Sequence, residues 1–160
     1  MRTHLKNYTI VGLTCFIACF IDQYSKQSVL QMIVSNGALE VTSFLNFIIV
    51  WNKGVSFGLF SGYNWSPNIF IIIAIVIIVF VLWLLKAYNP VIQGLIIGGA
   101  LGNMIDRALF GAVFDFIDIH AFGWHYPTFN IADSFIVCSA IAIILQEVLP
   151  LLHVKKRNKI

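Results

Sequence analysis

Four apolar stretches, each close to the length that crosses a bilayer, account for most of this chain. They cover approximately residues 8–28, 67–86, 90–110 and 134–152. An α-helix needs about 20 mostly apolar residues to cross the hydrocarbon core. Because 59% of the 160 residues are hydrophobic and only 11% are charged, the chain lacks the polar surface of a soluble domain of this size. The sequence therefore predicts an integral membrane protein with four transmembrane helices.

Local signals indicate where the third helix begins and how it packs. Asn89 precedes Pro90 at the start of the third stretch, which gives a side-chain cap followed by proline at a position that needs no N–H. Gly94, Gly98 and Gly102 then recur at intervals of four residues. This spacing places the glycines on one helix face, where another helix can approach closely. We therefore expect the third helix to pack tightly against a neighbour.

The basic residues predict the orientation of the chain. Cytoplasmic ends of transmembrane helices carry an excess of Lys and Arg. With four spans, the chain places most of its basic residues on one side: Arg2, Lys6, Lys86, Lys155, Lys156, Arg157 and Lys159. We expect both termini to be cytoplasmic, so that residues 31–66 and 111–133 form two segments on the outer, periplasmic side.

The two outer segments are expected to hold most of the polar chemistry and some β structure. Residues 40–60 are rich in Val, Phe, Ile and Trp, with the turn signal Asn-Lys-Gly at 52–54, which predicts a small antiparallel sheet on the outer membrane surface. Residues 118–128 are expected to form a mobile loop, either a lid whose aromatic side chains exclude water or a segment whose aromatic side chains rest among the lipid headgroups. The predicted fold class is a membrane all-α protein with a small β element, forming one domain over residues 1–160.

Two aspartates, Asp115 and Asp133, lie just outside the ends of the third and fourth apolar stretches. An ionised carboxylate near hydrocarbon costs free energy, so a pair of carboxylates at the membrane edge indicates a functional role. Two close carboxylates do not both ionise easily, so that one holds a proton while the other draws a proton from water. Metal or other cofactors are not expected, since H-E-x-x-H is absent and His120 and His125 lack a cysteine or carboxylate pattern.

Other polar residues near the expected outer ends of the helices have two interpretations each. Asp22 and Lys26, spaced i,i+4, form either a plain ion pair or a support for the site. Asn103 and Arg107 share one helix face, from which they either position a substrate or tie helices together. Asn130, three residues before the second aspartate, either bonds a carboxylate or the substrate, or caps the fourth helix.

Two further acids are expected to lie outside the chemistry. Asp106, next to Arg107, is assigned to structure, and Asp118 is assigned to an exposed part of the outer loop. Neither is therefore a candidate for the catalytic pair.

A four-span proton-coupled transporter is the alternative interpretation. Such a protein also holds acids in the membrane, but it needs them near the midplane, whereas Asp115 and Asp133 lie at one edge. Nucleic acid is not expected as a partner, because the net charge of +3 includes no basic patch with interleaved aromatics.

Five short motifs resemble the lipoprotein signal peptidase family, also called signal peptidase II. They read, in chain order, DQYSK (22–26), NKGVSFG (52–58), GGALGNMIDR (98–107), GAVFDF (111–116) and FNIAD (129–133). Their order and spacing follow the family over nearly the whole chain. Val55 is the clearest departure, since the family usually has alanine there, and it affects no catalytic position.

The resemblance implies an aspartic endopeptidase of the bacterial inner membrane with its active site at the periplasmic face. The family cuts the signal peptide from prolipoproteins, just before a cysteine that carries diacylglycerol, and binds the lipopeptide antibiotic globomycin. Membrane lipid and lipidated precursors are thus the implied partners. The positions that match the catalytic pair are Asp115 and Asp133, and those that match supporting or substrate-binding residues are Asp22, Lys26, Asn52, Gly54, Asn103, Arg107 and Asn130.

Overall fold

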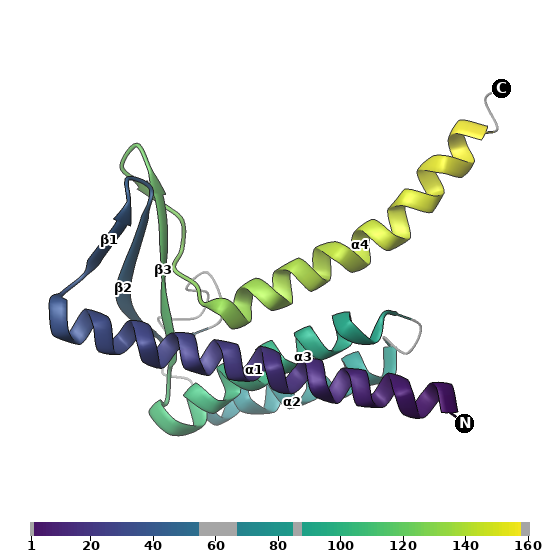
Figure 1. The fold of residues 1–160 in the computed structure, drawn as a ribbon, viewed down its shortest axis with the longest axis horizontal. Coiled ribbons are helices and arrows are strands. Elements are labelled where there is room, and N and C mark those ends of the chain that lie inside the picture. Colours follow the sequence, from purple (N-terminus) through teal and green to yellow (C-terminus); the bar gives the residue numbers. More distant parts are fainter. Residues whose placement is uncertain (1, 55–66, 85–87, 158–160) are drawn as a thin grey trace.

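A computed structural model describes residues 2–54, 67–84 and 88–157, and these residues form four helices and a four-stranded sheet. The helices are α1 (Arg2–Asn36), α2 (Pro67–Leu84), α3 (Pro90–Phe110) and α4 (Ile131–Arg157). The strands are β1 (Leu39–Thr42), β2 (Leu45–Asn52), β3 (Val113–Ala121) and β4 (Trp124–His125). Figure 1 shows the sheet at one end of the helices and both ends of the chain at the other.

The helix boundaries confirm the prediction for α3 and correct it for α1 and α4. The side chain of Asn89 accepts a 2.9 Å bond from the Val91 N–H at the start of α3, as its capping role predicts. Residues 31–36, expected in an outer segment, instead continue α1. That helix stops where Gly37 adopts a φ of 83° and donates its N–H to the carbonyl of Ile33 at 2.8 Å. The fourth helix begins at Ile131 rather than at residue 134.

The helices present the apolar surface of a membrane protein. Two of them, over Lys6–Asn36 and Ile131–Leu149, are long and apolar enough to cross a bilayer by themselves. In the described part of α2 the apolar run Ile69–Phe80 is shorter. Large apolar side chains are exposed along α1, α2 and α4, among them Phe16, Phe20, Ile72, Val76, Ile141 and Ile144. Covering these apolar side chains with lipid tails is favourable, whereas leaving them in water costs free energy.

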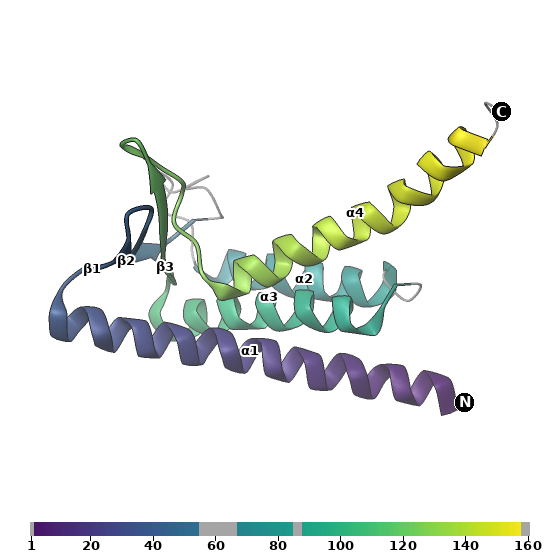
Figure 2. The ribbon, with the colours of Figure 1, turned by 45° about the horizontal axis from the view of Figure 1, so that its top comes forward.

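α3 lies at the centre of the helix group and contacts the other three helices (Figure 2). Its glycines explain the close approach. A Cβ atom at Gly98 would lie 2.5 Å from the carbonyl oxygen of Cys15 and 2.7 Å from Cβ of Ala18, both in α1. A Cβ atom at Gly99 would lie 2.7 Å from the carbonyl oxygen of Ala132 in α4. The tight packing predicted for the third helix is therefore confirmed on two of its faces.

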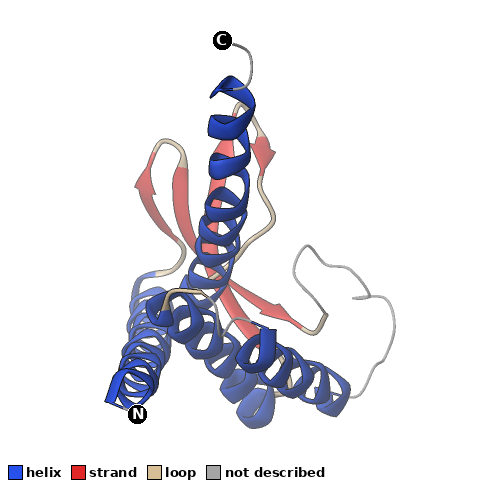
Figure 3. Ribbon diagram, turned by 90° about the vertical axis from the view of Figure 1, so that its right-hand side faces the viewer, coloured by secondary structure: helices blue, strands red, loops and turns tan. Residues whose placement is uncertain are grey.

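The antiparallel sheet has the strand order β1-β2-β3-β4 and lies across one end of the helices (Figure 3). Phe114 and Phe116 of β3 pack with Val29 and Ile33 near the end of α1, which fixes the sheet to the helix. The sheet predicted within residues 40–60 is confirmed in β1 and β2. β1 and β2 are joined between Thr42 and Leu45, a connection that the sequence did not predict. The part of the predicted sheet that follows the turn signal at 52–54 lies outside the described residues.

Residues 118–125, expected to belong to a loop, instead form a β-hairpin. β3 continues to Ala121, turns through Phe122 and Gly123, and pairs back with β4. Both turn residues have positive φ, 53° and 81°, as a two-residue hairpin requires. A phenylalanine at the first of these positions gives no turn signal in a sequence. The two aspartates of the expected catalytic pair lie on different elements, Asp115 in β3 and Asp133 in α4.

Candidate active site

Asp115 lies in the buried part of β3 and is only 2% exposed. Its carboxylate accepts a 3.0 Å bond from Nδ2 of Asn52, at the end of β2, and a 2.7 Å bond from Nδ2 of Asn130, just before α4. The register of the sheet explains the first contact, since Asn52 pairs with Val113 and Val50 pairs with Asp115 itself. Two amide donors therefore orient the Asp115 carboxylate from two different elements.

Asp133 lies in the first turn of α4 and shares a reciprocal cap with Asn130. The side-chain oxygen of Asn130 accepts the Asp133 N–H at 3.0 Å, and the Asn130 N–H donates to Oδ2 of Asp133 at 3.3 Å. This is the geometry of a capping box at a helix start. The two interpretations of Asn130 are thus both correct, because the same residue caps the helix and donates to the Asp115 carboxylate.

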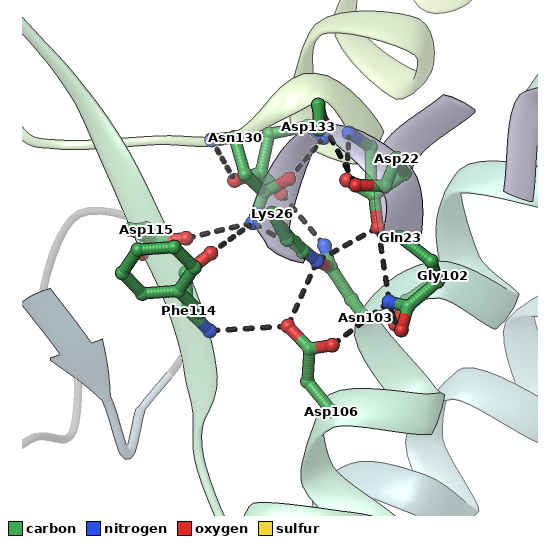
Figure 4. A network of polar contacts seen from close by, with 12 residues as sticks. Asp22, Gln23, Lys26, Gly102, Asn103, Asp106, Phe114, Asp115, Asn130 and Asp133 are labelled. Carbon is green, nitrogen blue, oxygen red and sulfur yellow. Dashed lines mark hydrogen bonds and ion pairs between the residues drawn. The ribbon is translucent and has the colours of Figure 1, made fainter. Parts of the chain in front are cut away.

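Asn103 of α3 completes the link between the two aspartates (Figure 4). Its Nδ2 donates to Oδ1 of Asp133 at 2.9 Å. Its Oδ1 accepts from Nδ2 of Asn130 and from Nζ of Lys26, each at 3.0 Å. An ammonium group has no acceptor, so the Lys26 contact requires the amide oxygen on that side and turns the amide nitrogen of Asn103 toward Asp133.

Asp22 and Lys26 form the ion pair expected from their spacing, and the pair is buried beside the site. Nζ of Lys26 lies 2.8 Å from a carboxylate oxygen of Asp22 and 2.8 Å from one of Asp106. Asp22 is 0% exposed and Lys26 is 4% exposed. Buried charges are retained only when they are paired and hydrogen-bonded, so these three residues must act as a unit.

Arg107 approaches the site from the outer end of α3. Its Nη2 donates to the carbonyl of Gly54 at 3.0 Å, and its guanidinium lies 5.3 Å from the ring centre of Phe70 in α2. The Gly54 N–H in turn donates to Oδ1 of Asn52 at 2.9 Å. Among the described residues, Nε of Arg107 is buried without a hydrogen-bond partner.

Asp118 is not the exposed loop acid that the sequence suggested. It is 3% exposed in β3, and its two carboxylate oxygens lie 2.8 and 3.0 Å from Nδ1 of His125. The ring of His125 also stacks on that of His120, with 4.9 Å between centres. Among the described residues, no group of three or more His, Cys, Asp or Glu side chains is arranged to hold a metal ion. The cluster stabilises the hairpin and makes no contact with Asp115 or Asp133.

The environment of Asp115 allows it to hold a proton near neutral pH. Burial raises the pKa of Asp115 to about 6; the bond from Asn52 opposes this rise, and the negative charge of Asp133 adds to it. The site therefore combines a carboxyl group that can be protonated with a second carboxyl group close enough to influence it. General acid and general base catalysis by two carboxyl groups requires this combination.

The bond network around Asp115 and Asp133 also includes the Asp106 carboxylate, which the sequence analysis placed outside the site. Nε2 of Gln23 donates to Asp106 at 2.8 Å and to the carbonyl of Gly102 at 3.1 Å. A signal for Asp106 was present, because it lies three residues after Asn103 and so shares its helix face.

Comparisons with protein families and with individual proteins agree with each other. The family model described as signal peptidase (SPase) II matches residues 14–149. A lipoprotein signal peptidase from Anaplasma marginale (strain Florida) is 39% identical over 145 residues, covering 88% of this chain and 85% of that protein. One from Janthinobacterium sp. (strain Marseille) is 40% identical over 137 residues, covering 82% of this chain and 83% of that protein.

Two solved structures have the same fold. Both are described as bacterial membrane enzymes. The first has a TM-score of 0.70 and 34% identity, with 85% of each chain covered. The second has a TM-score of 0.68 and 32% identity, covering 84% of this chain and 89% of the other.

Proposed function

Because this chain belongs to the signal peptidase II family, we propose that it removes the signal peptide from prolipoproteins with Asp115 and Asp133 as its catalytic pair. Membership of a peptidase family makes the chain an enzyme, and its apolar helices make it a membrane protein. The whole chain of 160 residues is taken as one peptidase domain.

The observation that carries the assignment of the pair is the position of Asn130. Its side-chain amide donates to Asp115 at 2.7 Å, while its main-chain N–H donates to Asp133 at 3.3 Å. One residue thus holds a carboxyl group from β3 and another from α4 at a common point. Asp106 and Asp22, the other buried acids nearby, are both occupied by Lys26 and are unsuited to exchange protons with a substrate.

The chemistry follows from sharing one proton between the two carboxyl groups. The ionised group takes a proton from a water molecule, and the water oxygen attacks the carbonyl carbon of the scissile bond to give a tetrahedral diol. The protonated partner gives its proton to the carbonyl oxygen, which completes the diol. The first group then gives the leaving nitrogen the proton that it took from water, and a hydroxyl of the diol returns a proton to the partner. The C–N bond breaks, which releases the signal peptide as an acid and the lipidated cysteine as a free amine. The two groups titrate as a pair, so the proton belongs to the pair.

Three further residues are assigned to holding the substrate. Arg107 binds the carbonyl of Gly54 through Nη2, which supports a role in holding the main chain of the precursor beside the end of β2. Asn52 and Gly54 lie between Arg107 and Asp115 in the bond network, so the end of β2 lies beside the scissile bond. Asn103 donates to Asp133 and is assigned to supporting the catalytic pair.

The proposed topology has four spans, both termini in the cytoplasm and the active site at the periplasmic face of the inner membrane. The sheet, with Asp115, lies at the end of the helices opposite both termini, which supports a single outer face (Figure 1). Basic residues at the other end, including Arg2 and Lys6 before the first span and Lys155 after the fourth, support a cytoplasmic location for that end.

Lipid is a proposed partner because a largely apolar pocket lies beside Asp133. A pocket of about 240 Å³ opens beside Asp133, and its lining includes Tyr126, Phe129, Val137 and Cys138. These side chains suit an acyl chain of a diacylglyceryl-cysteine precursor. Each methylene buried contributes about 0.8 kcal/mol, so acyl chains hold a precursor at the membrane far better than its peptide does. Globomycin-type inhibitors would place a hydroxyl group between the two aspartates, where the diol forms.

The function is tested with one precursor prepared with and without its diacylglyceryl group. Purified wild-type protein should release the signal peptide from the lipidated form, and mass spectrometry should find the new N-terminus at the modified cysteine. The unlipidated form should be cut very slowly, even at saturating enzyme. Equal rates for the two forms in the same detergent would contradict the proposed substrate and favour a general membrane protease.

A further inference from the structure

Asp106 has no part in the chemistry above, yet it is only 2% exposed and fully bonded. One carboxylate oxygen accepts from Gln23 at 2.8 Å. The other accepts from Nζ of Lys26 at 2.8 Å and from the main-chain N–H of Phe114 at 3.1 Å. Phe114 is the residue immediately before Asp115. A carboxylate of α3 therefore fixes the backbone that carries the first catalytic residue.

Asp22 makes the equivalent contact to the other half of the pair. Its Oδ1 accepts the main-chain N–H of Ala132 at 2.8 Å, and its Oδ2 pairs with Lys26. Ala132 is the residue immediately before Asp133. Each of the two buried carboxylates thus holds the N–H that precedes one catalytic aspartate, and such charge-assisted bonds are about twice as strong as neutral ones.

Lys26 joins these two contacts to each other. An ammonium group has three donors, and the partners of Nζ are Asp22, Asp106 and Oδ1 of Asn103 (Figure 4). Asn103 in turn donates to Asp133. All three bonds of the lysine are therefore directed toward groups that set the position or orientation of the catalytic pair.

We propose that Asp106 is a positioning residue of the reaction, which with Asp22 and Lys26 sets the distance between Asp115 and Asp133 by holding the main chain before each of them. The proposal rests on the proposed function of that pair. Displacement of a reacting group by about 1 Å is enough to cost on the order of 100-fold in rate. The role should therefore appear in kcat, with KM nearly unchanged, because the hydrogen bonds and ion pair of the Asp106 carboxylate go to Gln23, Phe114 and Lys26 and not to the substrate-holding side chains of Arg107 and Asn52.

A purely structural role is the rival explanation, and it makes a different prediction. A network that only ties α1 to α3 would alter thermal stability and the yield of folded protein, but each folded molecule would retain its kcat. Gln23→Met is the matched control. It removes the bonds of Gln23 to the other oxygen of Asp106, to the Gly102 carbonyl and, at 3.4 Å, to Oδ2 of Asp22. It leaves in place the bonds of both carboxylates to the main chain and to Lys26.

The test compares Asp106→Asn, Asp106→Glu and Gln23→Met in purified protein, with kcat and KM for a lipidated precursor normalised to the amount of folded enzyme. Asp106→Glu keeps the ion pair with Lys26 but displaces the carboxylate, so it should remain folded. We expect kcat to fall on the order of 10- to 100-fold in both Asp106 variants, with KM within about twofold of wild type. Gln23→Met should lose thermal stability and keep its kcat.

A kcat in Asp106→Glu within twofold of Gln23→Met would overturn the proposal. Failure of both Asp106 variants to fold would also overturn it, because Asp106 would then be assigned to holding the helices together. These outcomes are distinct from failure of the proposed function, in which the wild-type protein itself would not cut the lipidated precursor.

Discussion

Asn130 and Asp133 cap each other: the Asn130 side-chain oxygen accepts the Asp133 N–H at 3.0 Å, and the Asn130 N–H donates back to the Asp133 carboxylate at 3.3 Å. The start of α4 and the candidate active site are therefore the same structure. The remaining group of Asn130, its Nδ2, donates to Asp115 at 2.7 Å. Helix capping can be separated from the contact to Asp115, because the two use different atoms of Asn130.

Replacing Asn130 by serine should keep the helix and impair the reaction. Serine is a good N-cap, but it lacks the amide nitrogen that reaches Asp115. Asn130→Ala removes both contacts and should be less stable than Asn130→Ser by about 1 kcal/mol. Thermal unfolding and cleavage rates of the two variants check this. Wild-type kcat in Asn130→Ser would mean that the amide contact to Asp115 is dispensable.

The raised pKa of Asp115 predicts a particular dependence of stability on pH. Because the folded-state pKa rises from 3.8 to about 6, the contribution of this group to folding stability is fully present below pH 3.8 and is lost as the pH rises through about 6. The stability of wild type relative to Asp115→Asn should therefore fall by up to about 3 kcal/mol between pH 4 and pH 7, to an order of magnitude.

This pH dependence is measured from the unfolding of both proteins in one detergent across that pH range. The variant has no titratable group at position 115, so the pH effects of groups that do not interact with Asp115 cancel in the difference, which reports Asp115 together with its coupling to Asp133. A difference in stability that is constant, or that rises with pH, would show that burial does not favour the protonated form of Asp115.

A bulky side chain at Gly54 should block processing without preventing membrane insertion. Gly54 is buried, accepts from Arg107 at 3.0 Å and donates to Asn52 at 2.9 Å, so Gly54→Leu would intrude where the precursor is proposed to lie. Gly12→Leu is the control, since nothing lies within 4 Å of a Cβ atom at that position. Protease protection reports insertion, and normal cleavage by Gly54→Leu would remove this loop from the substrate site.

Gly98 should be among the least replaceable residues of the helix group. A methyl group there would meet the Cys15 carbonyl oxygen at 2.5 Å, so Gly98→Ala should destabilise the protein by about 1–3 kcal/mol. Gly12→Ala, in an open position, should not destabilise it comparably. Melting temperatures in detergent compare the two, and equal values would mean that α1 and α3 are less closely packed than described.

Features that depend on neighbouring residues could be predicted from the sequence. The Asn89 cap and the glycine face of α3 are examples, because each follows from spacing along one helix. Asp115 and Asp133 were proposed because carboxylates are scarce in this apolar chain and because they match the family's catalytic pair, whereas Asn52 and Gly54 were assigned from the family resemblance alone. Neither kind of reasoning gives the partner of a residue that lies far away in the sequence.

The predictions that failed concern contacts between residues that are far apart in the sequence. The pairing of β3 with β2 joins residues more than 60 positions apart, as Asn52 and Asp115 show, and no local pattern specifies it. Asp118 is buried because that pairing and His125 cover it, whereas its sequence neighbours suggest a loop. Asp106 was assigned to structure because its contact to the Phe114 N–H arises only when α3 and β3 fold together.

The most direct measurement is the cleavage of a lipidated precursor by Asp115→Asn and Asp133→Asn, each confirmed as folded and inserted in the membrane. Asparagine keeps the shape of the side chain but cannot exchange a proton, so both variants should have no measurable turnover. Asp118→Asn is the control, since it changes a buried carboxylate of the same strand that lies outside the pair, and it should keep most of its activity. Near-normal turnover in either of the first two variants, or an equal loss in Asp118→Asn, would contradict the assignment of Asp115 and Asp133 as the catalytic pair.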